Sequence, residues 1–376
     1  MGDKELIYSM ALTRMRHIGF QVALELYRRL GSGTEIYENR KNIRDVVPDC
    51  SPKLQEALSD WDEPIRRAET EMEFCLAKHI EVLRYGDVGY PRRLMECQDA
   101  PIVLYYRGSA DLNQAKILNI VGTRRCTPYG IDSIKKLMSD LASLCPKVLI
   151  ISGLAYGIDI NAHRQALKNG FETVGVLAHG LDFIYPSLHR ETAKEMIGQG
   201  GLITEYMTKT KADKGNFVRR NRIVAGMSDA CIVIESAAKG GGLITAKIAQ
   251  SYSKEVFALP GRITDTYSEG CNRLILDNTA TILTSAEDMV NVMGWDYDKK
   301  REEALSKGIE RDMFPMLNEE QNRIASELAQ SGDLPMDILA AKTGYGISKL
   351  SSLLFEMEMM GVVRPLAGGI YHLLSV

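Results

Sequence analysis

The sequence lacks the features that would direct a protein into a membrane or out of the cell. None of its apolar runs reaches the length of about eighteen residues that a membrane-spanning helix needs. The first residues, Met1 to Glu5, carry acids where a signal peptide carries positive charge, and Leu6 breaks the pattern for N-terminal myristoylation. We therefore expect a cytoplasmic protein that makes no membrane contact.

Metal-binding patterns of cysteine are missing as well. The seven cysteines are odd in number and scattered, with no Cys-x-x-Cys pair and no His cluster beside them. Cysteines in this pattern are typical of reduced thiols. We expect no metal ion and no disulfide framework.

The common signatures of cofactor binding and catalysis are also absent. The chain contains no Gly-x-Gly-x-x-Gly, no Walker A and no Gly-x-Ser-x-Gly sequence, and no acidic residue stands at the spacing of a ribose clamp. Three histidines lack a neighbouring nucleophile or a metal-binding partner, so we expect structural roles for His163, His179 and His189. These absences predict a protein that has no cofactor and is not an enzyme.

An excess of positive charge is lacking over the chain as a whole. The 46 Lys and Arg residues and 49 Asp and Glu residues give a formal net charge of -3. That balance disfavours a nucleic-acid partner, because phosphate contacts require Lys and Arg. A chain of 376 residues, 45% of them hydrophobic, can form two or three units with a large core.

Residues 1–78 have the pattern of a small helical domain. Apolar residues recur at helical spacing from Leu6 to about Leu58, with short turns between them. The segment Ile18 to Ala23 resembles the turn of a helix-hairpin-helix, which binds DNA phosphate through backbone amides, but ordinary helix packing explains the same residues equally well. We expect an N-terminal helical domain of the SAM or helix-hairpin-helix type.

Residues 79–295 alternate short β-branched runs with helical segments, the pattern of a parallel sheet that is covered on both faces. We expect an extended Rossmann-like, doubly wound α/β fold in this region. The predicted strands are Ile117–Val121, Val148–Ser152, Thr173–Ala178, Leu202–Glu205, Cys231–Glu235, Val256–Leu259 and Thr281–Leu283. The predicted helices lie near Tyr129–Leu144, Asp159–Lys168, Arg190–Ile197, Val218–Met227 and Leu243–Ser253.

The last part of the chain predicts a linker, residues 296–315, and a winged helix, residues 316–376. From Met316 onward, four Lys or Arg residues stand against seven Asp or Glu residues, a poor match to duplex DNA. We expect this domain to contact a protein or to act as a spacer. Its predicted elements are three helices and two strands: Glu319–Gln330, Met336–Lys342, Ile347–Met360, Val362–Pro365 and Gly369–Leu373.

The most informative segment is a basic strip, Lys209 to Arg222, in an otherwise acidic protein. It holds six basic residues and one acid, Asp213, within fourteen positions. A concentration of this kind indicates an anionic partner, although a solvated charged face is the alternative. Its basic residues are Lys209, Lys211, Lys214, Arg219, Arg220 and Arg222.

The position of the strip on a helix favours the anionic partner. Asn216 is suited to cap a helix, which would place the arginines that follow it in the first two turns. The helix dipole disfavours cations there, and a bound polyanion would offset that cost. Phe217 among these charges fits a residue that stacks on a base, although it could equally belong to the core.

Two glycine-rich loops could hold phosphate. Gly122, Thr123 and Arg124 follow the predicted strand Ile117–Val121, so amides, a hydroxyl and a guanidinium group would converge at its carboxyl end. The run from Gly240 to Thr245 opens a predicted helix in the same way. A third turn, Ser152 to Asp159, ends a strand, and Asp159 is expected to cap the next helix.

Read together, these segments resemble the DNA-processing protein A family, also called DprA or Smf, over roughly Ile80 to Met293. Two departures occur: Gly240 to Gly242 replace the family's usual Ser-Gly-Ser, and Ser187 to His189 lack the Asn common after Tyr-Pro. The ordered matches are Ile120-Val121-Gly122-Thr123-Arg124, Ser152 to Asp159 with Ala162-His163, Gly180-Leu181-Asp182 with Tyr185-Pro186, Phe217 to Gly226, Gly242 to Ala246, and Pro260-Gly261.

The resemblance implies a homodimer that binds single-stranded DNA, protects incoming strands and loads the RecA recombinase during natural transformation and homologous recombination. It implies phosphate contacts for Gly122, Thr123 and Arg124, and a base contact for Phe217. The remaining residues of the expected DNA-binding set are Lys214, Arg219, Arg220, Asn221, Arg222, Gly240, Gly241, Gly242 and Thr245.

Two rival functions stay open. Related Rossmann-like folds hydrolyse nucleoside monophosphates with a glycine-rich loop followed closely by Glu, but the segment Thr245 to Ile248 offers no such carboxylate. A regulator that reads duplex DNA with the C-terminal domain is the other rival, and the acidic balance of that domain disfavours it.

Overall fold

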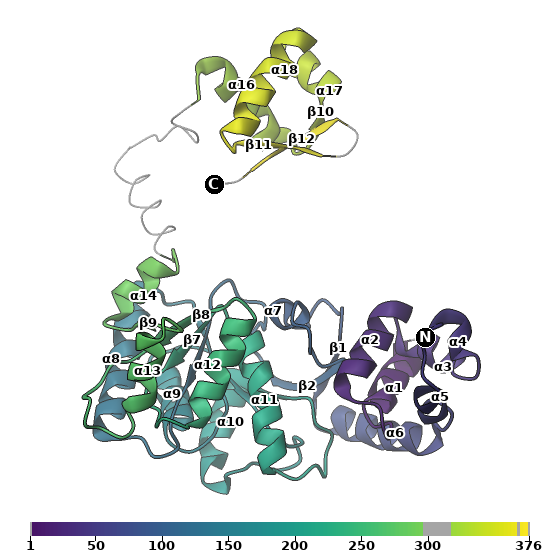
Figure 1. Ribbon diagram of the computed structural model, residues 1–376, viewed down its shortest axis with the longest axis vertical. Coiled ribbons are helices and arrows are strands. Elements are labelled where there is room, and N and C mark those ends of the chain that lie inside the picture. Colours follow the sequence, from purple (N-terminus) through teal and green to yellow (C-terminus); the bar gives the residue numbers. More distant parts are fainter. Residues whose placement is uncertain (1, 296–316, 367–368, 375–376) are drawn as a thin grey trace. The chain divides into compact units, whose positions relative to one another are not determined.

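The computed structural model describes residues 2–295, 317–366 and 369–374. The chain divides into two compact units, Met1–Asp296 and Tyr297–Val376 (Figure 1). The predicted linker, residues 296–315, lies outside the described residues. None of the helices in the described ranges has both the length and the apolar character that crossing a bilayer requires.

The first unit is built on a nine-stranded sheet of order β1-β2-β6-β5-β4-β3-β7-β8-β9. Neighbours from β6 to β9 are parallel, while β1 and β2 add antiparallel pairs at one edge. The α/β class and the seven strands expected from the sequence are confirmed; β1 and β2 had not been predicted. The strands are β1 Glu81–Arg84, β2 Val103–Gly108, β3 Ile117–Val121, β4 Leu149–Ser152, β5 Thr173–Val176, β6 Gly200–Thr204, β7 Ala230–Val233, β8 Glu255–Ala258 and β9 Thr281–Ile282.

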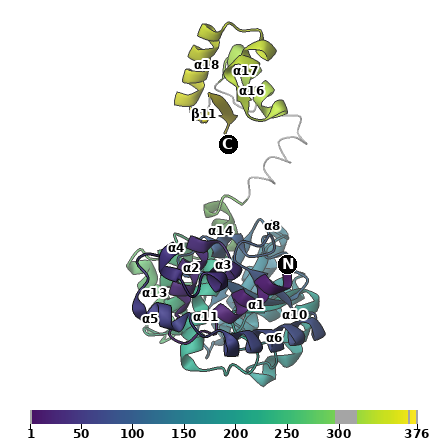
Figure 2. The ribbon, with the colours of Figure 1, turned by 90° about the vertical axis from the view of Figure 1, so that its right-hand side faces the viewer.

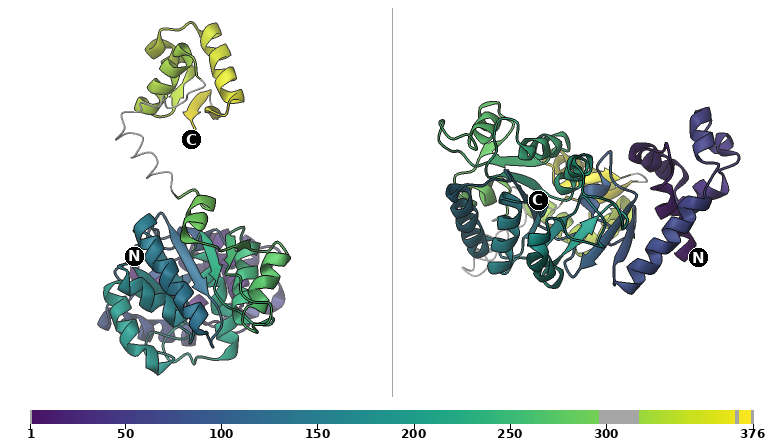
Figure 3. Two further views of the ribbon diagram at one scale, coloured as in Figure 1. Left: turned by 90° about the vertical axis from the view of Figure 1, so that its left-hand side faces the viewer. Right: turned by 90° about the horizontal axis from the view of Figure 1, so that it is seen from below.

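Helices cover both faces of the sheet (Figure 3). Alternate residues of a strand point to opposite faces, so Leu118 of β3 packs in one apolar cluster with Met138, and Ile117 packs in another with Ile223. The helices around the sheet are α7 Arg92–Met95, α8 Pro128–Leu144, α9 Ile158–Lys168, α10 Arg190–Gly198, α11 Lys214–Gly226, α12 Gly241–Ser251, α13 Glu269–Leu276 and α14 Ala286–Val292, with a 3-10 turn at Ser187–His189.

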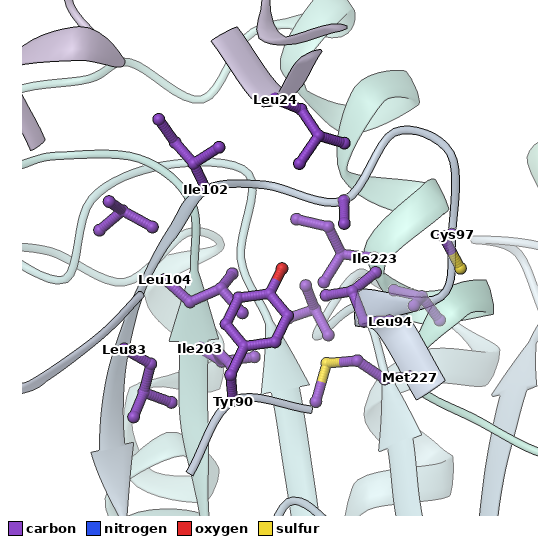
Figure 4. Close-up of a cluster of buried hydrophobic side chains, with 14 of the residues drawn as sticks. Leu24, Leu83, Tyr90, Leu94, Cys97, Ile102, Leu104, Ile203, Ile223 and Met227 are labelled. Carbon is purple, nitrogen blue, oxygen red and sulfur yellow. The ribbon is translucent and has the colours of Figure 1, made fainter. Parts of the chain in front are cut away.

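Six helices precede the sheet and share its core (Figures 1 and 2). Leu24 of α2 belongs to the same apolar cluster as Leu104 of β2 and Ile223 of α11. Tyr90 lies among these side chains (Figure 4), and its hydroxyl donates to the Pro101 carbonyl at 2.6 Å. The helices are α1 Gly2–Leu12, α2 Phe20–Leu30, α3 Gly33–Glu38, α4 Ile43–Val46, α5 Pro52–Ala57 and α6 Asp62–Ala77.

The second unit is a winged helix, as the sequence predicts. Its three-stranded sheet has the order β10-β12-β11, and β10 is an addition to the predicted hairpin. Asn318 and Gln321 form a reciprocal capping box at the start of α16. The elements are α16 Glu319–Ser331, β10 Leu334–Pro335, α17 Met336–Thr343, α18 Ile347–Met359, β11 Val363–Leu366 and β12 Ile370–Leu373.

Candidate nucleic-acid interface

The strands β3 and β7 lie side by side, although β4, β5 and β6 separate them in the sequence. After β3 the chain winds toward one edge of the sheet, and after β7 it winds toward the other. The loops that follow these two strands therefore diverge and leave a crevice at the carboxyl ends of the strands, where open α/β sheets bind ligands. They are the two loops in which the sequence predicts phosphate binding.

The β3–α8 loop is held tightly at its base and exposed at its tip. A Cβ atom on Gly122 would lie 2.5 Å from Ile158 Cγ1 and 2.7 Å from the Glu235 carbonyl oxygen, so only glycine fits. The Thr123 amide donates to that carbonyl at 2.7 Å, and the Thr123 carbonyl accepts from the Ile158 amide at 3.1 Å. The next residue, Arg124, has an exposed side chain.

The Glu235 side chain connects the two loops through hydrogen bonds. Its carboxylate is buried, accepts a hydrogen bond from the Thr127 amide at 2.9 Å and accepts another from the Thr127 hydroxyl. This carboxylate follows β7 and fastens the start of α8, so both loops are attached to one buried group.

The β7–α12 loop lies against the β3–α8 loop. A Cβ atom on Gly242 would stand 3.2 Å from Gly122 Cα, whereas Gly241 is exposed and has open space around its Cα. Gly240 caps α12 and Gly241 begins it, so the positive end of the helix dipole faces the crevice. Thr245 is only 2% exposed and therefore packs inside the protein.

The helix α11, which carries most of the basic strip, begins earlier than predicted. Asp213 is its N-cap, and the Asp213 carboxylate accepts from the Asn216 amide at 2.8 Å, so the prediction of Asn216 as the cap was wrong. An aspartate cap outcompetes an asparagine three residues later because its charge also favours the helix N-terminus. Lys214 is the first helical residue, and Arg219 moves to the second turn.

One face of α11 meets the β3–α8 loop. The Arg124 Cζ atom lies 4.9 Å from the centroid of the Phe217 ring, a cation–π distance, and Phe217 is half-buried. The Tyr185 ring stands 5.9 Å from the Phe217 ring in a tilted arrangement and is 45% exposed. The structure thus brings together a guanidinium group and two aromatic rings at the crevice.

Two of the arginines on α11 are buried, although Arg220 lies close to the Phe217 ring, and burial removes them from the surface as expected DNA contacts. Arg220 is 3% exposed and donates to the Gly153 carbonyl at 2.6 Å and to the Val176 carbonyl, while burial lowers the pKa of its guanidinium to about 10. Arg222 is 4% exposed and forms an ion pair with Glu205. These two arginines hold α11 to the sheet, so we do not count them among the DNA contacts.

Three other residues of the predicted set lie on α11 and are exposed or half-buried. Lys214 and Arg219 are exposed, and Asn221 is half-buried. The Arg219 Cζ atom lies 5.6 Å from the centroid of the Phe20 ring, which α2 contributes. Arg219 therefore faces the N-terminal helices and does not join the Arg124–Phe217 pair.

Three exposed aromatic residues near the crevice escaped the sequence reasoning. Tyr185 belongs to the β5–α10 connection, as does Phe183, which stacks on His179 at 4.3 Å between centroids. Tyr156 follows β4 and packs edge-on against His189. The Tyr185-Pro186 pair was visible in the sequence, but nothing in a single chain reveals that a tyrosine side chain is exposed beside Phe217.

The turn after β4 differs from the prediction at one residue. Gly157, with φ +75°, is the N-cap of α9, so the prediction of Asp159 as the cap was wrong. Asp159 is the second residue of α9 and is buried, and its carboxylate accepts from the Ala155 amide at 3.4 Å. Burial raises the pKa of Asp159, and the buried Arg220 opposes that rise.

The three histidines are buried and bonded inside the protein. The Nδ1 atom of His163 pairs with the Thr173 hydroxyl at 2.7 Å, and the Nδ1 atom of His179 with the Gly180 carbonyl at 2.8 Å. The Nδ1 atom of His189 lies 2.9 Å from the Leu154 carbonyl. Burial lowers the pKa of His163 to about 3 and lowers the pKa of the other two as well. Their hydrogen bonds accord with structural roles.

Comparison with known proteins adds independent information on this fold. The family model for the DNA recombination-mediator protein A matches residues 81–294, and the model for the DprA winged helix domain matches residues 315–369. Protein Smf of Synechocystis sp. is 30% identical over 404 aligned residues, which cover 99% of this chain and 100% of that protein.

Two solved structures are similar to this chain. The X-ray structure of DNA processing protein A from Streptococcus pneumoniae has a TM-score of 0.64 and 30% identity, and the match covers 76% of this chain and 97% of that one. DNA processing protein A from Helicobacter pylori, solved for insight into its unique single-stranded DNA binding mode, has a TM-score of 0.52 and 31% identity, with 58% and 96% covered.

Proposed function

Because the chain belongs to the DNA-processing protein A family, we propose that it binds single-stranded DNA at the crevice between β3 and β7. The observation that carries this proposal is the Arg124 guanidinium 4.9 Å from the Phe217 ring, beside the N-terminus of α12. A cation and an aromatic ring side by side, next to backbone amides, can hold a phosphate and a base of one nucleotide.

Each part of the crevice has a distinct role in the proposal. Arg124 and Lys214 hold phosphates, and the amide of Gly241 adds an uncharged donor at the positive end of α12. Phe217 stacks on a base, and Tyr185 extends the aromatic surface. Stacking requires an unpaired base, so the site favours single strands over duplex DNA.

We propose that the bound strand is held and not cut. A nucleotide hydrolase of this fold needs a free carboxylate beside the glycine-rich loop, and the carboxylate that follows β7, Glu235, is buried and accepts from Thr127. Incubation with AMP should therefore release no adenine in a chromatographic assay. Steady release of adenine would favour the hydrolase instead.

The finer parts of the proposal concern partners. We propose that the protein acts in the cytoplasm, protects incoming strands during natural transformation and transfers them to a RecA-type recombinase; the family's description as a recombination mediator supports the transfer step. We also propose a homodimer, for which the exposed apolar residues Ile263, Leu276 and Ile282 near the β9 edge offer a surface. Light scattering of the intact protein measures the dimer.

We assign the winged helix to protein contact or spacing. In a winged helix that reads duplex DNA, the helix corresponding to α18 carries basic residues, but here Lys349 is paired with Glu320. Phe355 and Met359 on the same helix are 62% and 74% exposed. An apolar, acid-paired helix surface fits a protein better than a phosphate backbone.

The experiment that tests the central proposal is a competition between short single-stranded and duplex DNA at several salt concentrations. We expect the single strand to win, and Arg124→Glu to weaken its binding and to lower the salt slope by about one unit. Lys135→Glu on the exposed outer side of α8 is the matched control, because it makes the same charge change away from the crevice. Equal loss in both variants, or preference for duplex DNA, would reject the site.

A further inference from the structure

A cavity of about 340 Å³ lies where the loop between α1 and α2 meets the connection from β6 to α11. This volume lies within the range of about 300–1,000 Å³ that small-molecule sites occupy. None of the residues assigned to the crevice between β3 and β7 lines it, whereas Arg219, which faces the N-terminal helices, does. The lining residues used below are Arg14, Phe20, Glu205, Tyr206, Thr210 and Arg219.

The charge of the cavity favours an anion. Arg14 and Arg219 are both exposed at its rim, and they come from different parts of the chain, the α1–α2 loop and α11. Glu205 is the acid in the lining, and its carboxylate is paired with the buried Arg222. The two rim arginines therefore carry positive charge that the lining does not neutralise.

The inner surface of the cavity offers an aromatic ring and unused polar atoms. Phe20 is half-buried under the guanidinium groups of Arg219 and Arg222, at 5.6 and 4.8 Å. Several buried side-chain polar atoms of the described residues lack a hydrogen-bond partner, and two of them, the Tyr206 hydroxyl and the Glu205 Oε1 atom, belong to residues that line the cavity. Buried polar atoms are nearly always paired, so these two point to a ligand with its own donors and acceptors.

The protonation of Tyr206 fits a donor role. Burial raises its pKa above the ordinary value for tyrosine, so the hydroxyl keeps its proton at neutral pH and can donate a hydrogen bond. Glu205 Oε1 can accept one. A nucleobase presents both kinds of group along one edge, and its ring can lie against Phe20.

An open groove connects this cavity with the first residue of α11. Lys214, Val218, Arg219 and Phe20 line the groove, and the last two also line the cavity. A strand bound at Lys214 can therefore follow α11 past Arg219 toward the α1–α2 loop without crossing the core.

We propose that this cavity is a second nucleotide site, in which Arg14 and Arg219 hold a phosphate while Phe20, Tyr206 and Glu205 receive the base. The inference rests on the proposed function, because the occupant is a nucleotide of the same single strand that Arg124 and Phe217 hold. The N-terminal helices then take part directly in DNA binding. The same chemistry would also accept a free nucleotide, and the test separates the two sources.

The test compares oligothymidylates of about six and about twenty nucleotides, since single-strand sites span about 4–16 nucleotides. Arg14→Glu should weaken binding of the long strand about tenfold and leave the short strand unchanged, because only the long strand reaches the cavity. Arg16→Glu is the matched control in the same loop: it is exposed but does not line the cavity, so we expect a change within about twofold.

Tyr206→Phe removes one oxygen atom and separates a binding role from a structural one. The variant should bind the long strand about threefold to tenfold more weakly while melting at the same temperature as the parent or higher, because the buried hydroxyl has no partner within the protein. A lower melting temperature with unchanged binding would show that the hydroxyl serves the fold, and would overturn its role as a base contact.

The outcomes distinguish failure of this inference from failure of the proposed function. If the parent protein binds neither strand, the proposed function fails. If Arg124→Glu weakens both strands while Arg14→Glu and Tyr206→Phe change neither, the crevice stands and the cavity is not on the DNA path. In that case binding of deoxyadenosine monophosphate is measured by calorimetry: loss of that binding in Arg14→Glu assigns the cavity to a free nucleotide, and no binding overturns the site.

Discussion

The exposed and the buried basic residues of α11 are of the same kind and are used in opposite ways. The exposed residues Lys214 and Arg219 reach solvent, and Phe217 meets Arg124 at the crevice. The buried residues Arg220 and Arg222 bond to carbonyl and carboxylate groups of the protein. A run of arginines therefore predicts a charged helix, but only packing decides which of them can meet DNA.

The largest expected effect is a loss of stability when a buried arginine of α11 is removed. Arg220→Ala should lower the free energy of unfolding by about 3–5 kcal/mol, because the Gly153 and Val176 carbonyls lose a charged donor and Asp159 loses the cation that opposes the rise of its pKa. Urea denaturation measures the change. Arg219→Ala, which removes an exposed arginine, is the control and should stay within about 0.5 kcal/mol. Equal stability of the two variants would contradict the distinction between the buried and the exposed arginines.

The next effect concerns Phe217 at the crevice and should change the affinity for DNA without changing stability. Phe217→Ala should cost about 1–3 kcal/mol of affinity for a single strand if the ring stacks on a base. Phe217→Tyr keeps the ring and should retain most of that affinity. Fluorescence anisotropy gives the dissociation constants, and urea midpoints report folding. Unchanged affinity in the alanine variant would show that Phe217 does not contact DNA and serves only in packing.

A third prediction concerns how stability depends on pH, because burial and the nearby Arg220 disfavour a positive charge on His163. Burial, with a contribution from Arg220, lowers the pKa of His163 to about 3. The unfolded chain takes up this proton near pH 6.5 and the folded protein does not, so stability is complete above that pH and falls by about 1.4 kcal/mol for each unit below it.

His163→Gln tests this pH dependence, because it removes the titrating group and keeps a polar side chain near Thr173. Urea midpoints at about pH 7.5 and pH 5.5 should differ less in the variant than in the parent. The same loss of stability in both proteins would assign the acid sensitivity to other groups, such as His179 and His189.

The smallest effect extends the comparison to the winged helix. Lys349 is the basic residue of α18 and is already paired with Glu320. Lys349→Glu should therefore change single-strand affinity by less than about 0.3 kcal/mol, the scale of an exposed ion pair. An anisotropy titration beside Arg124→Glu checks it. A loss comparable to that of Arg124→Glu would bring the winged helix into the DNA site.

The sequence predicts the parallel core of the fold well and its edge poorly. The strands β3 to β9 are short β-branched runs that their own composition reveals, and they were found. β2 is stabilised by antiparallel pairing with β6, for example Tyr105 with Thr204, nearly a hundred positions away. The distance hides the pairing partner and not the strand itself: Val103 to Tyr106 are aliphatic and aromatic residues typical of a strand, so β2 had a local pattern that was missed.

The candidate site was predicted where local sequence patterns reveal it and missed where contacts between distant residues decide. The two glycine-rich loops and Phe217 could be proposed because turn chemistry and a basic strip are local patterns. The cap at Asp213 was missed because Asn216 has the same propensity, and hydrogen bonding decides between them. The burial of Arg220 depends on the carbonyl groups of Gly153, directly after β4, and of Val176 in β5, which no spacing within α11 shows.

The pairing of β3 with β7 has a consequence for biosynthesis. Leu118 aligns with Ala230, so the crevice consists of segments that a ribosome produces far apart in time. A nascent chain that has completed β6 has an Arg124 loop but neither β7 nor α12 beside it. The proposed site is therefore complete only after most of the first unit has been synthesised and folded.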